Sequence, residues 1–302
     1  IINPYINEDF SNIVLSKQDG LLQSWISFQK DMWINKVNII DPRNIYNNFI
    51  HSCKERGYYF ESFIQNDAED FLNIFLELLH KSIEFKVNFN IKGTPKNKYD
   101  YMQIDSLKAW NSFFKKSYSH IIKNFYSQTL VMTQCPLCEY NTRNYEPLMV
   151  ISLPLYKGCD SLDDLLKRYT HKEKNNIESE KWTCDKCSQR VNQLKKTIFW
   201  KYSPYLIILL KRYNSNLTKN NKKIEYSEYI DLNKYTLNYN KKTTKYKLES
   251  ICIQEGGYGG GHYYSMCKCD EKWNIYNDTR VSPTTINNVL DQSPYILFYK
   301  II

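Results

Sequence analysis

Two Cys-x-x-Cys pairs, Cys135-Pro-Leu-Cys138 and Cys184-Asp-Lys-Cys187, constrain the fold of this chain more than any other feature. Two residues between the cysteines let both sulfurs of one turn point at a single ion, and four thiolates suit tetrahedral zinc. The pairs lie too far apart for a compact zinc ribbon, so each is expected at the tip of its own hairpin. A ligand set made of four cysteines leaves no open position, and the sequence therefore predicts structural zinc.

The alternatives to a zinc site are four free buried thiols or a thioredoxin-like redox pair, for which no βαβ context is apparent. Nine cysteines is an odd number, and a chain of 302 residues does not need a disulfide framework. This cysteine usage fits a reducing intracellular compartment, the cytoplasm or the nucleus. No apolar run reaches the length of a membrane span and no signal peptide is visible, so no membrane span is expected.

The composition describes a globular protein, with 42% hydrophobic and 15% aromatic residues. The net charge of +9 admits nucleic-acid or membrane partners in principle. The lysines, however, are scattered through polar loops, and the abundance of Tyr, Asn, Lys and Ile is typical of an AT-biased genome. No nucleic-acid partner is therefore expected.

The first third of the chain shows helical patterns. Asp41-Pro42 predicts an N-cap and a first-turn proline for a helix that runs to about Glu55 and stops at Gly57. A stronger helix is predicted with Asn66 as its cap and with apolar residues at helical spacing as far as Ile83. Residues 87–101 are expected to be a polar connector.

After about residue 126 the pattern changes to short runs rich in β-branched and aromatic residues. Strands are predicted at Thr197–Trp200, Tyr205–Tyr213, Leu248–Ile253, His262–Lys268, Trp273–Tyr276 and Tyr295–Lys300. Two polar stretches, residues 214–223 and 233–247, are expected to be loops. The fold class is therefore α+β, with helices first and an antiparallel sheet second.

A second group of residues that can carry chemistry lies near the C-terminus. A glycine-rich turn ends in Gly261-His262-Tyr263, and Asn277-Asp278 follow one short hairpin later. Neighbouring antiparallel strands can place Asn277 or Asp278 against one ring nitrogen of His262, which leaves the other free to act on a thiol. The plainer reading is a surface or core histidine next to a flexible hairpin tip. A phosphate-binding loop is not expected, because no Lys-Ser/Thr or helix start follows.

Taken together and in order, these pieces resemble the ubiquitin-specific protease family of cysteine deubiquitinases. Gln65-Asn-Asp-Ala-Glu-Asp-Phe-Leu72 is similar to the family's Gln-Gln-Asp-Ala-x-Glu-Phe-Leu box, with Asn66 and Asp70 as the departures. The two cysteine pairs, the Leu210-Lys-Arg-Tyr213 stretch, the Gly261-His262-Tyr263 box and the closing run Tyr295–Tyr299 match further motifs. The match spans about residues 57 to 300.

The resemblance implies a papain-like thumb, palm and fingers architecture. Residues 1–125 are then expected to form the helical thumb-like part, residues 126–200 the zinc-bearing fingers, and residues 201–302 the palm with the His box. It also implies ubiquitin or ubiquitinated proteins as partners. His262 is the expected general base, oriented by Asn277 with Asp278 beside it.

The resemblance further implies contacts with the ubiquitin tail, for which the expected residues are Gln65, Asp67, Asp70, Gly261 and Tyr263. An acidic helix start suits a basic, Arg-bearing peptide tail, although these carboxylates can equally cap the helix. The glycines before His262 leave room for a diglycine in a narrow channel.

One family feature is missing, the early Asn-x-Cys box that carries the nucleophile. Cys53 is the only cysteine in the first 64 residues, and it lies near the C-terminal end of its predicted helix, where the helix dipole disfavours a thiolate. The nucleophile is therefore expected upstream of Ile1. Two functions remain open: an active deubiquitinase whose cysteine lies in that segment, and an inactive ubiquitin-binding pseudoenzyme.

Overall fold

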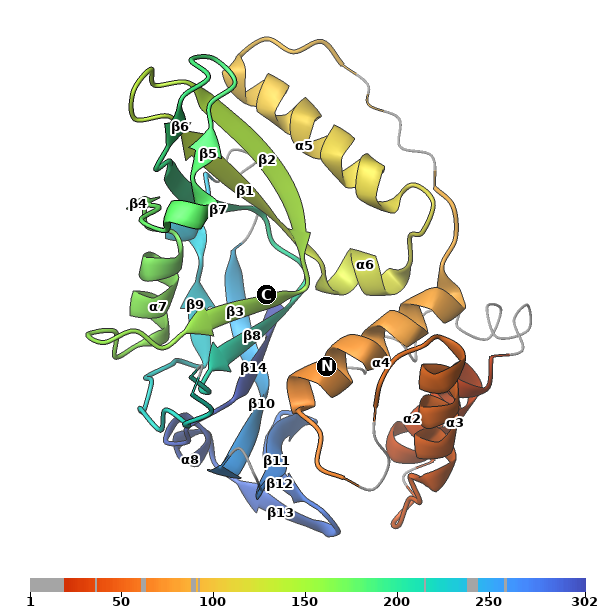
Figure 1. Cartoon of the computed structure of the whole chain (residues 1–302). Coiled ribbons are helices and arrows are strands. Elements are labelled where there is room, and N and C mark those ends of the chain that lie inside the picture. The colour runs from red at the N-terminus through yellow and green to blue at the C-terminus, as the bar shows by residue number, and fades with distance from the viewer. Residues whose placement is uncertain are drawn as a thin grey trace. The chain divides into compact units, whose positions relative to one another are not determined.

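The computed structural model describes residues 19–35, 37–60, 64–87, 91, 93–214, 216–237, 244–257 and 260–302. The chain divides into two compact units, one comprising residues 1–87 and 116–123 and the other residues 88–115 and 124–302. Helices dominate the first part of the chain and mostly antiparallel strands the second, as Figure 1 shows. The predicted α+β class is confirmed.

The first unit contains the helices α2 (Gly20–Trp33), α3 (Arg43–Glu55) and α4 (Ala68–Ile83) and most of the short helix α6 (His120–Phe125). The carboxylate of Asp19 caps α2 by accepting from the backbone N–H of Leu22 at 3.0 Å. The same carboxylate accepts from Ser82 Oγ on α4 at 2.6 Å. One capping residue therefore also fastens α4 to the start of α2.

The predicted starts of two helices were wrong by one residue. The first predicted helix begins at Arg43, and Asp41 lies outside it, accepting from the Arg43 N–H at 3.0 Å. Helix α4 is capped by Asp67, which accepts from Glu69 N–H at 2.6 Å, and not by Asn66. Asp and Asn are equally good caps, so the sequence could not choose between two adjacent candidates.

Helix α5 (Lys98–Phe114) overlaps the end of the expected polar connector and corrects it. A capping box starts this helix: Asn97 accepts from the helix backbone while the Asp100 side chain accepts from the Asn97 N–H. The buried side chains of the helix recur every fourth residue, at Met102, Ser106, Trp110 and Phe114. This narrow stripe was hidden among polar residues.

The second unit contains a four-stranded sheet in the order β2-β1-β7-β4 and a two-stranded ribbon of β5 and β6. Their bounds are β1 (Ser127–Gln134), β2 (Asn141–Leu148), β4 (Glu173–Lys174), β5 (Trp182–Thr183), β6 (Arg190–Val191) and β7 (Leu194–Lys201). The tip of the β1–β2 hairpin and the tip of the β5–β6 hairpin each carry one of the cysteine pairs, as predicted.

The larger sheet of this unit has the order β13-β12-β11-β10-β14-β8-β3, with β9 paired to β10. Its strands are β3 (Val150–Pro154), β8 (Tyr205–Lys211), β9 (Tyr229–Asp231), β10 (Lys245–Gly257), β11 (Gly260–Cys269), β12 (Lys272–Asn277), β13 (Arg280–Thr284) and β14 (Ile296–Ile301). All six predicted strands are present, although their ends differ. The loop expected at residues 233–247 is corrected at its end, because residues 245–247 begin β10.

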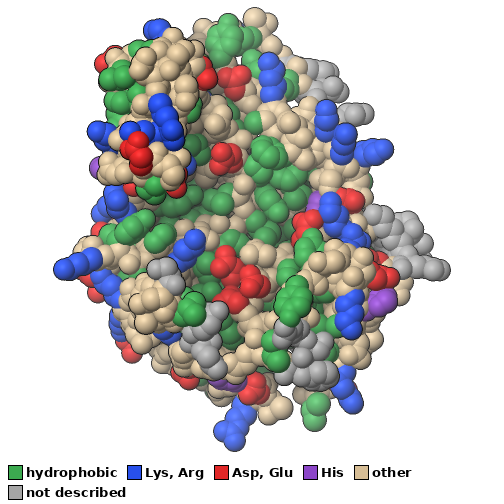
Figure 2. All heavy atoms as spheres, in the orientation of Figure 1, with side chains coloured by type: hydrophobic (Ala, Val, Ile, Leu, Met, Phe, Trp, Pro, Cys, Tyr) green, Lys and Arg blue, Asp and Glu red, His purple; other side chains and the backbone are tan. Residues whose placement is uncertain are grey.

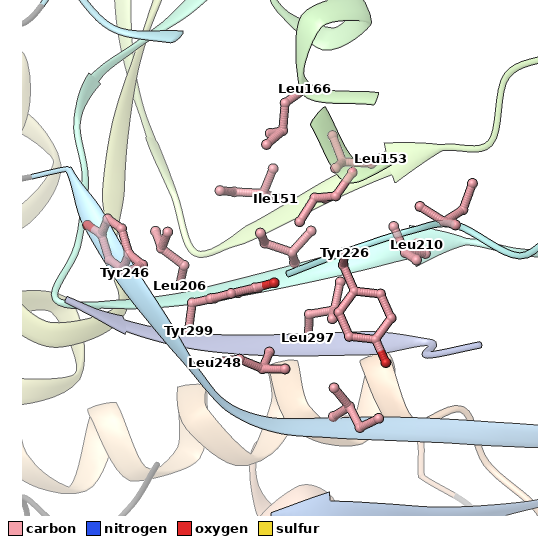
Figure 3. Packing of buried hydrophobic residues seen from close by; sticks show 14 of the residues in the cluster. Ile151, Leu153, Leu166, Leu206, Leu210, Tyr226, Tyr246, Leu248, Leu297 and Tyr299 are labelled. Atoms are coloured by element: carbon pink, nitrogen blue, oxygen red, sulfur yellow. The ribbon is translucent and has the colours of Figure 1, made fainter. Parts of the chain in front are cut away.

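A large hydrophobic core lies between this sheet and helix α7 (Leu162–Tyr169). Figure 3 shows side chains of β3, β8, β10 and β14 converging with Leu166 of α7. Full burial of a side chain of this size stabilises the fold by about 1.5–3 kcal/mol. The core fixes the strands whose ends carry the candidate site.

A β-bulge in β10 keeps that strand's apolar residues on one face. Leu248 pairs with Tyr299 and Ser250 with Phe298, so Glu249 is an extra residue in the ladder. Leu248 and Ile251 therefore both reach the core, although they are three residues apart. Without the bulge, the strand period of two would place them on opposite faces.

No helix in the described ranges has both the length and the apolarity needed to cross a bilayer. On the face shown in Figure 2, Lys and Arg side chains are spread over separate elements and do not merge into one continuous patch.

Candidate active site and metal centre

The glycine-rich turn between β10 and β11 brings two strand ends unusually close. Gly256 has φ of +88°, and a Cβ there would lie 2.5 Å from the carbonyl oxygen of Gly260. A Cβ at Gly261 would lie 2.3 Å from Nε2 of Gln254. Neither position has room for a side chain. The glycines therefore allow the close approach of the two strands at the start of β11, in which His262 is the third residue.

Two neighbouring β strands bring His262 and Asn277 together. This is the arrangement expected if Asn277, and not Asp278, faces the ring. His262 Nε2 lies 2.7 Å from Oδ1 of Asn277, which ends β12. Asp278 follows in the turn with φ of +50°, and its carboxylate lies 3.9 Å from the same nitrogen. Asn277 is therefore the direct partner of the ring, and Asp278 is a more distant and more exposed neighbour.

This hydrogen bond determines what the ring can do. Because an amide oxygen only accepts, the hydrogen of a neutral imidazole is placed on Nε2 when Asn277 Oδ1 faces it. Among the described residues, no hydrogen bond engages Nδ1 of His262, and 42% of its side chain is exposed. An exposed, unprotonated Nδ1 can take a proton from a thiol.

Tyr264 supports the ring from the same face of β11. The two rings lie nearly parallel, with 6.5 Å between centroids and 19° between planes. The Tyr264 hydroxyl donates to Glu255 Oε1 at 3.2 Å. Burial, together with the Glu255 charge, raises the pKa of Tyr264 to about 12, so it stays a neutral donor. The sequence analysis missed Tyr264, although the strand period of two places it beside His262.

Tyr263 follows His262 directly and therefore points to the other face of the strand. Its ring lies 6.0 Å from that of Tyr295, which precedes β14. The Tyr263 ring therefore faces the segment that leads into β14.

The acidic residues predicted at the start of α4 lie in the first unit. Gln65 is exposed, and Asp67 acts as the helix cap. Partial burial raises the pKa of Asp70, and the charge of Asp67 raises it further. Two carboxylates that repel each other at a helix start favour a cationic neighbour.

Cys53 lacks the features of a nucleophile. Its side chain is buried near the C-terminal end of α3, with 1% of the residue exposed. Burial raises the pKa of this thiol. An activated cysteine needs a lowered pKa and access to substrate, so the structure agrees with the prediction that Cys53 is not catalytic.

The four predicted metal ligands lie together. The sulfurs of Cys135, Cys138, Cys184 and Cys187 all lie within 4.8 Å of one another. The Cys135–Cys187 sulfurs are 3.8 Å apart and the Cys138–Cys184 sulfurs 3.6 Å apart. Tetrahedral zinc with bonds of about 2.3 Å needs sulfurs about 3.8 Å apart. The cluster can hold a metal ion of this kind.

The two knuckles repeat one backbone arrangement. Cys135 and Cys184 each accept a backbone hydrogen bond from the residue four positions later, Glu139 at 3.0 Å and Ser188 at 2.8 Å. Glu139 and Ser188 both have positive φ, near +58° and +56°. Burial opposes ionisation of Cys135, but N–H groups of Cys138 and Leu137 outweigh it and lower the pKa of this thiol. In the same turn the Tyr140 N–H favours the Cys138 thiolate, but burial and the neighbouring thiols of the cluster raise the pKa of Cys138 to about 12.

Residues 4–299 match the family model described as ubiquitin carboxyl-terminal hydrolase. The chain is 26% identical over 267 residues to human ubiquitin carboxyl-terminal hydrolase 21. The aligned region covers 80% of this chain and 47% of that protein. It is 28% identical over 301 residues to ubiquitin carboxyl-terminal hydrolase Usp2 of Drosophila melanogaster, and the aligned region covers 96% of this chain and 31% of that protein. The chain thus spans half or less of these relatives' lengths.

The fold is similar to that of solved SAGA DUB modules. A structure of a Ubp8 variant with Sgf11, Sus1 and Sgf73, bound to monoubiquitin, has a TM-score of 0.72 at 20% identity and covers 100% of this chain and 63% of that chain. The Ubp8-Sgf11-Sgf73-Sus1 module has a TM-score of 0.69 at 19% identity, covering 99% and 62%. The likeness supports the predicted architecture, and the family match over nearly its whole length shows that this chain belongs to the ubiquitin-specific proteases, the ubiquitin carboxyl-terminal hydrolase family.

Proposed function

We propose that this chain belongs to a thiol-dependent deubiquitinase, which hydrolyses isopeptide and peptide bonds at the C-terminal glycine of ubiquitin. The observation that carries the proposal is the 2.7 Å contact between His262 Nε2 and Asn277 Oδ1 in a member of this family. An inactive scaffold has no chemical need for an oriented imidazole. Ubiquitin and ubiquitinated proteins are the proposed partners.

The reaction follows from the state of the ring. His262 Nδ1 takes the proton of a cysteine thiol, and the resulting imidazolium stays hydrogen-bonded to Asn277. The thiolate adds to the glycine carbonyl, and the leaving amine departs with the proton from Nδ1 as the acyl-enzyme forms. Water then attacks the thioester with His262 as base, releasing ubiquitin and restoring the thiol.

The nucleophile is proposed to lie outside the 302 residues of this chain. None of the nine cysteines stands in an Asn-x-Cys box, and Cys53 is buried. Four of the remaining cysteines form the metal cluster. None of the nine cysteines forms a disulfide, which suits the proposed reducing environment of the cytoplasm or nucleus.

Contact with the ubiquitin tail is proposed, separately, for residues at the start of α4 and for residues beside His262 in β11. Asp67 and Asp70 present like charges that a cationic tail would relieve. A Cβ at Gly261 would meet Nε2 of Gln254 and the carbonyl oxygen of Glu255, so this glycine is needed for the packing of its own hairpin. Its contact with the ubiquitin tail is proposed from its place directly before His262. Gln65, two residues before Asp67, and Tyr263, the residue after His262, are the other proposed contacts.

Zinc is the proposed occupant of the four-cysteine cluster, in a structural role. The sulfur separations of 3.6 and 3.8 Å match a tetrahedral thiolate site. Around it, Val191 and the stacked rings of Tyr140 and Trp182 complete a small core. Zinc would hold the two hairpin tips in register.

We expect Cys184→Ser to abolish stoichiometric zinc binding and to lower the thermal midpoint by at least several degrees, because three thiolates hold zinc poorly. Elemental analysis and a melting curve measure both effects, with Cys159→Ser as the control outside the cluster. Full zinc content in Cys184→Ser would contradict the assignment.

Residues 1–302 alone are expected to remain unlabelled by a ubiquitin probe with a C-terminal electrophile, because none of their nine cysteines stands in an Asn-x-Cys box. The protein that includes about 30 further upstream residues should be labelled and should hydrolyse a ubiquitin–fluorophore substrate. Labelling of residues 1–302 that disappears in Cys53→Ala would overturn the assignment. An extended protein that binds ubiquitin without cleaving it would support the pseudoenzyme instead.

A further inference from the structure

Lys219 links the loop after β8 to the glycine-rich hairpin that carries His262. Its ammonium donates to the carbonyl oxygen of Gln254 at 2.5 Å and to that of Gly256 at 3.1 Å. Both carbonyls belong to the end of β10. Glu255, between them, pairs with His262 across the ladder.

These two carbonyls lie on the side of β10 where its other neighbouring strand has ended. Strand β14 pairs with β10 only as far as Cys252, whose carbonyl accepts from the Tyr295 N–H at 2.7 Å. Carbonyls two residues apart along a strand point the same way, so Gln254 and Gly256 continue the row beyond β14. Lys219 supplies the donors that a further strand would have supplied.

The lysine is itself held in place by its loop. Residue Tyr213 bridges Lys219 in antiparallel fashion, and the N–H of Asn220 donates to the Arg212 carbonyl at 2.6 Å. The buried Arg212 guanidinium donates to the carbonyls of Asn220 at 3.2 Å and Lys222 at 2.9 Å. The backbone on both sides of Lys219 is therefore anchored to the end of β8.

We propose that Lys219 is a positioning residue for the base: by bridging the carbonyls of Gln254 and Gly256 it fixes the end of β10, and through the β10–β11 ladder it fixes His262 against Asn277. Nothing in the local sequence marks this lysine among its neighbours. The glycines that make room in the hairpin also remove its internal stiffness, and an external clamp replaces that stiffness. The role in catalysis rests on the function proposed above, whereas the mechanical link does not.

The link can be tested on residues 1–302 without ubiquitin. We expect Lys219→Met to raise amide hydrogen exchange in residues 254–262 about tenfold or more. Nitrogen-15 spectra of the His262 ring should show loss of the single Nε2–H form. Lys219→Arg should restore both readouts, because its several donors can also bridge two carbonyls. Lys223→Met is the matched control, because Lys223 lies on the same loop as Lys219 and its ion pair, among the residues that the structure describes, is with the exposed Asp291.

Unchanged exchange and ring spectra in Lys219→Met would overturn the proposal, as would an equal effect of Lys223→Met. A melting curve shows whether Lys219→Met is folded, and if it is not, Lys219→Gln takes its place in the comparison. In the protein extended to include its nucleophile, kcat should fall about tenfold in Lys219→Met with little change in KM. If the unsubstituted extended protein fails to cleave ubiquitin, the proposed function fails, and the ring and exchange data still decide the link.

Discussion

We expect His262→Ala, in the protein extended to carry its nucleophilic cysteine, to lower kcat for ubiquitin–fluorophore hydrolysis by about a hundredfold or more. The substitution removes the group proposed to take the thiol proton and later to return it to the leaving amine. Ubiquitin affinity should hardly change, because the imidazole acts on the reacting atoms and contributes little contact area. Steady-state kinetics and a binding titration separate the two quantities.

Two matched variants sharpen this test. Asn277→Ala should cost less than His262→Ala, since the amide only orients the ring through the 2.7 Å contact. Asp278→Ala should cost least, because its carboxylate lies 3.9 Å away and 76% of its side chain is exposed. Equal activity of His262→Ala and the unsubstituted protein would show that another group is the base. A larger loss in Asp278→Ala than in Asn277→Ala would reverse their assigned roles.

The sequence could predict those parts of the site and the fold that depend on local turns, on helical spacing or on strands adjacent in the chain. Each Cys-x-x-Cys knuckle is a local turn, and its spacing alone predicts that its two sulfurs can bind the same metal ion. His262 and Asn277 lie on strands joined by a short hairpin, so neighbouring-strand pairing was enough to place them together. Helix α4 was recognised from its apolar spacing, with an error of one residue in its cap.

The features that the sequence did not reveal depend on distant partners. The parallel pairing of β3 with β8 joins strands far apart in the chain, and nothing local selects that partner. The bulge at Glu249 is visible only once the ladder with β14 is formed. Lys219 stands in a stretch that was predicted to be a polar loop, and its two carbonyl contacts come from β10.

Arg212 belongs to a motif that is visible in the sequence, but the contacts of its side chain are visible only in the structure. The sequence placed it in the Leu210-Lys-Arg-Tyr213 stretch, where alternation with Lys211 suggests only a strand end. In the structure Arg212 is 1% exposed. Its guanidinium donates to three backbone carbonyls, those of Asn220 at 3.2 Å, Lys222 at 2.9 Å and Pro294 at 2.8 Å. One side chain therefore joins the loop after β8 to the segment that leads into β14.

We expect Arg212→Met to destabilise the protein by about 3 kcal/mol or more, because it leaves three carbonyls without their charged donor. Burial lowers the pKa of Arg212, so the cation is kept at a desolvation cost. Arg212→Lys should recover only part of the loss, since an ammonium cannot reproduce the planar fork. Lys211→Met, at the exposed last residue of β8 directly before Arg212, should stay within about 0.5 kcal/mol of the unsubstituted protein.

Urea unfolding of the three variants, followed by tryptophan fluorescence, measures these differences. Because Arg212 also anchors the backbone beside Lys219, Arg212→Met should additionally speed amide exchange in the hairpin at residues 254–262. Destabilisation without faster exchange there would show that the clamp on the His262 hairpin holds independently of Arg212. A loss of stability no larger than that of Lys211→Met would show that water satisfies the three carbonyls as well as the guanidinium does, and that the buried cation is not what joins the loop to β14.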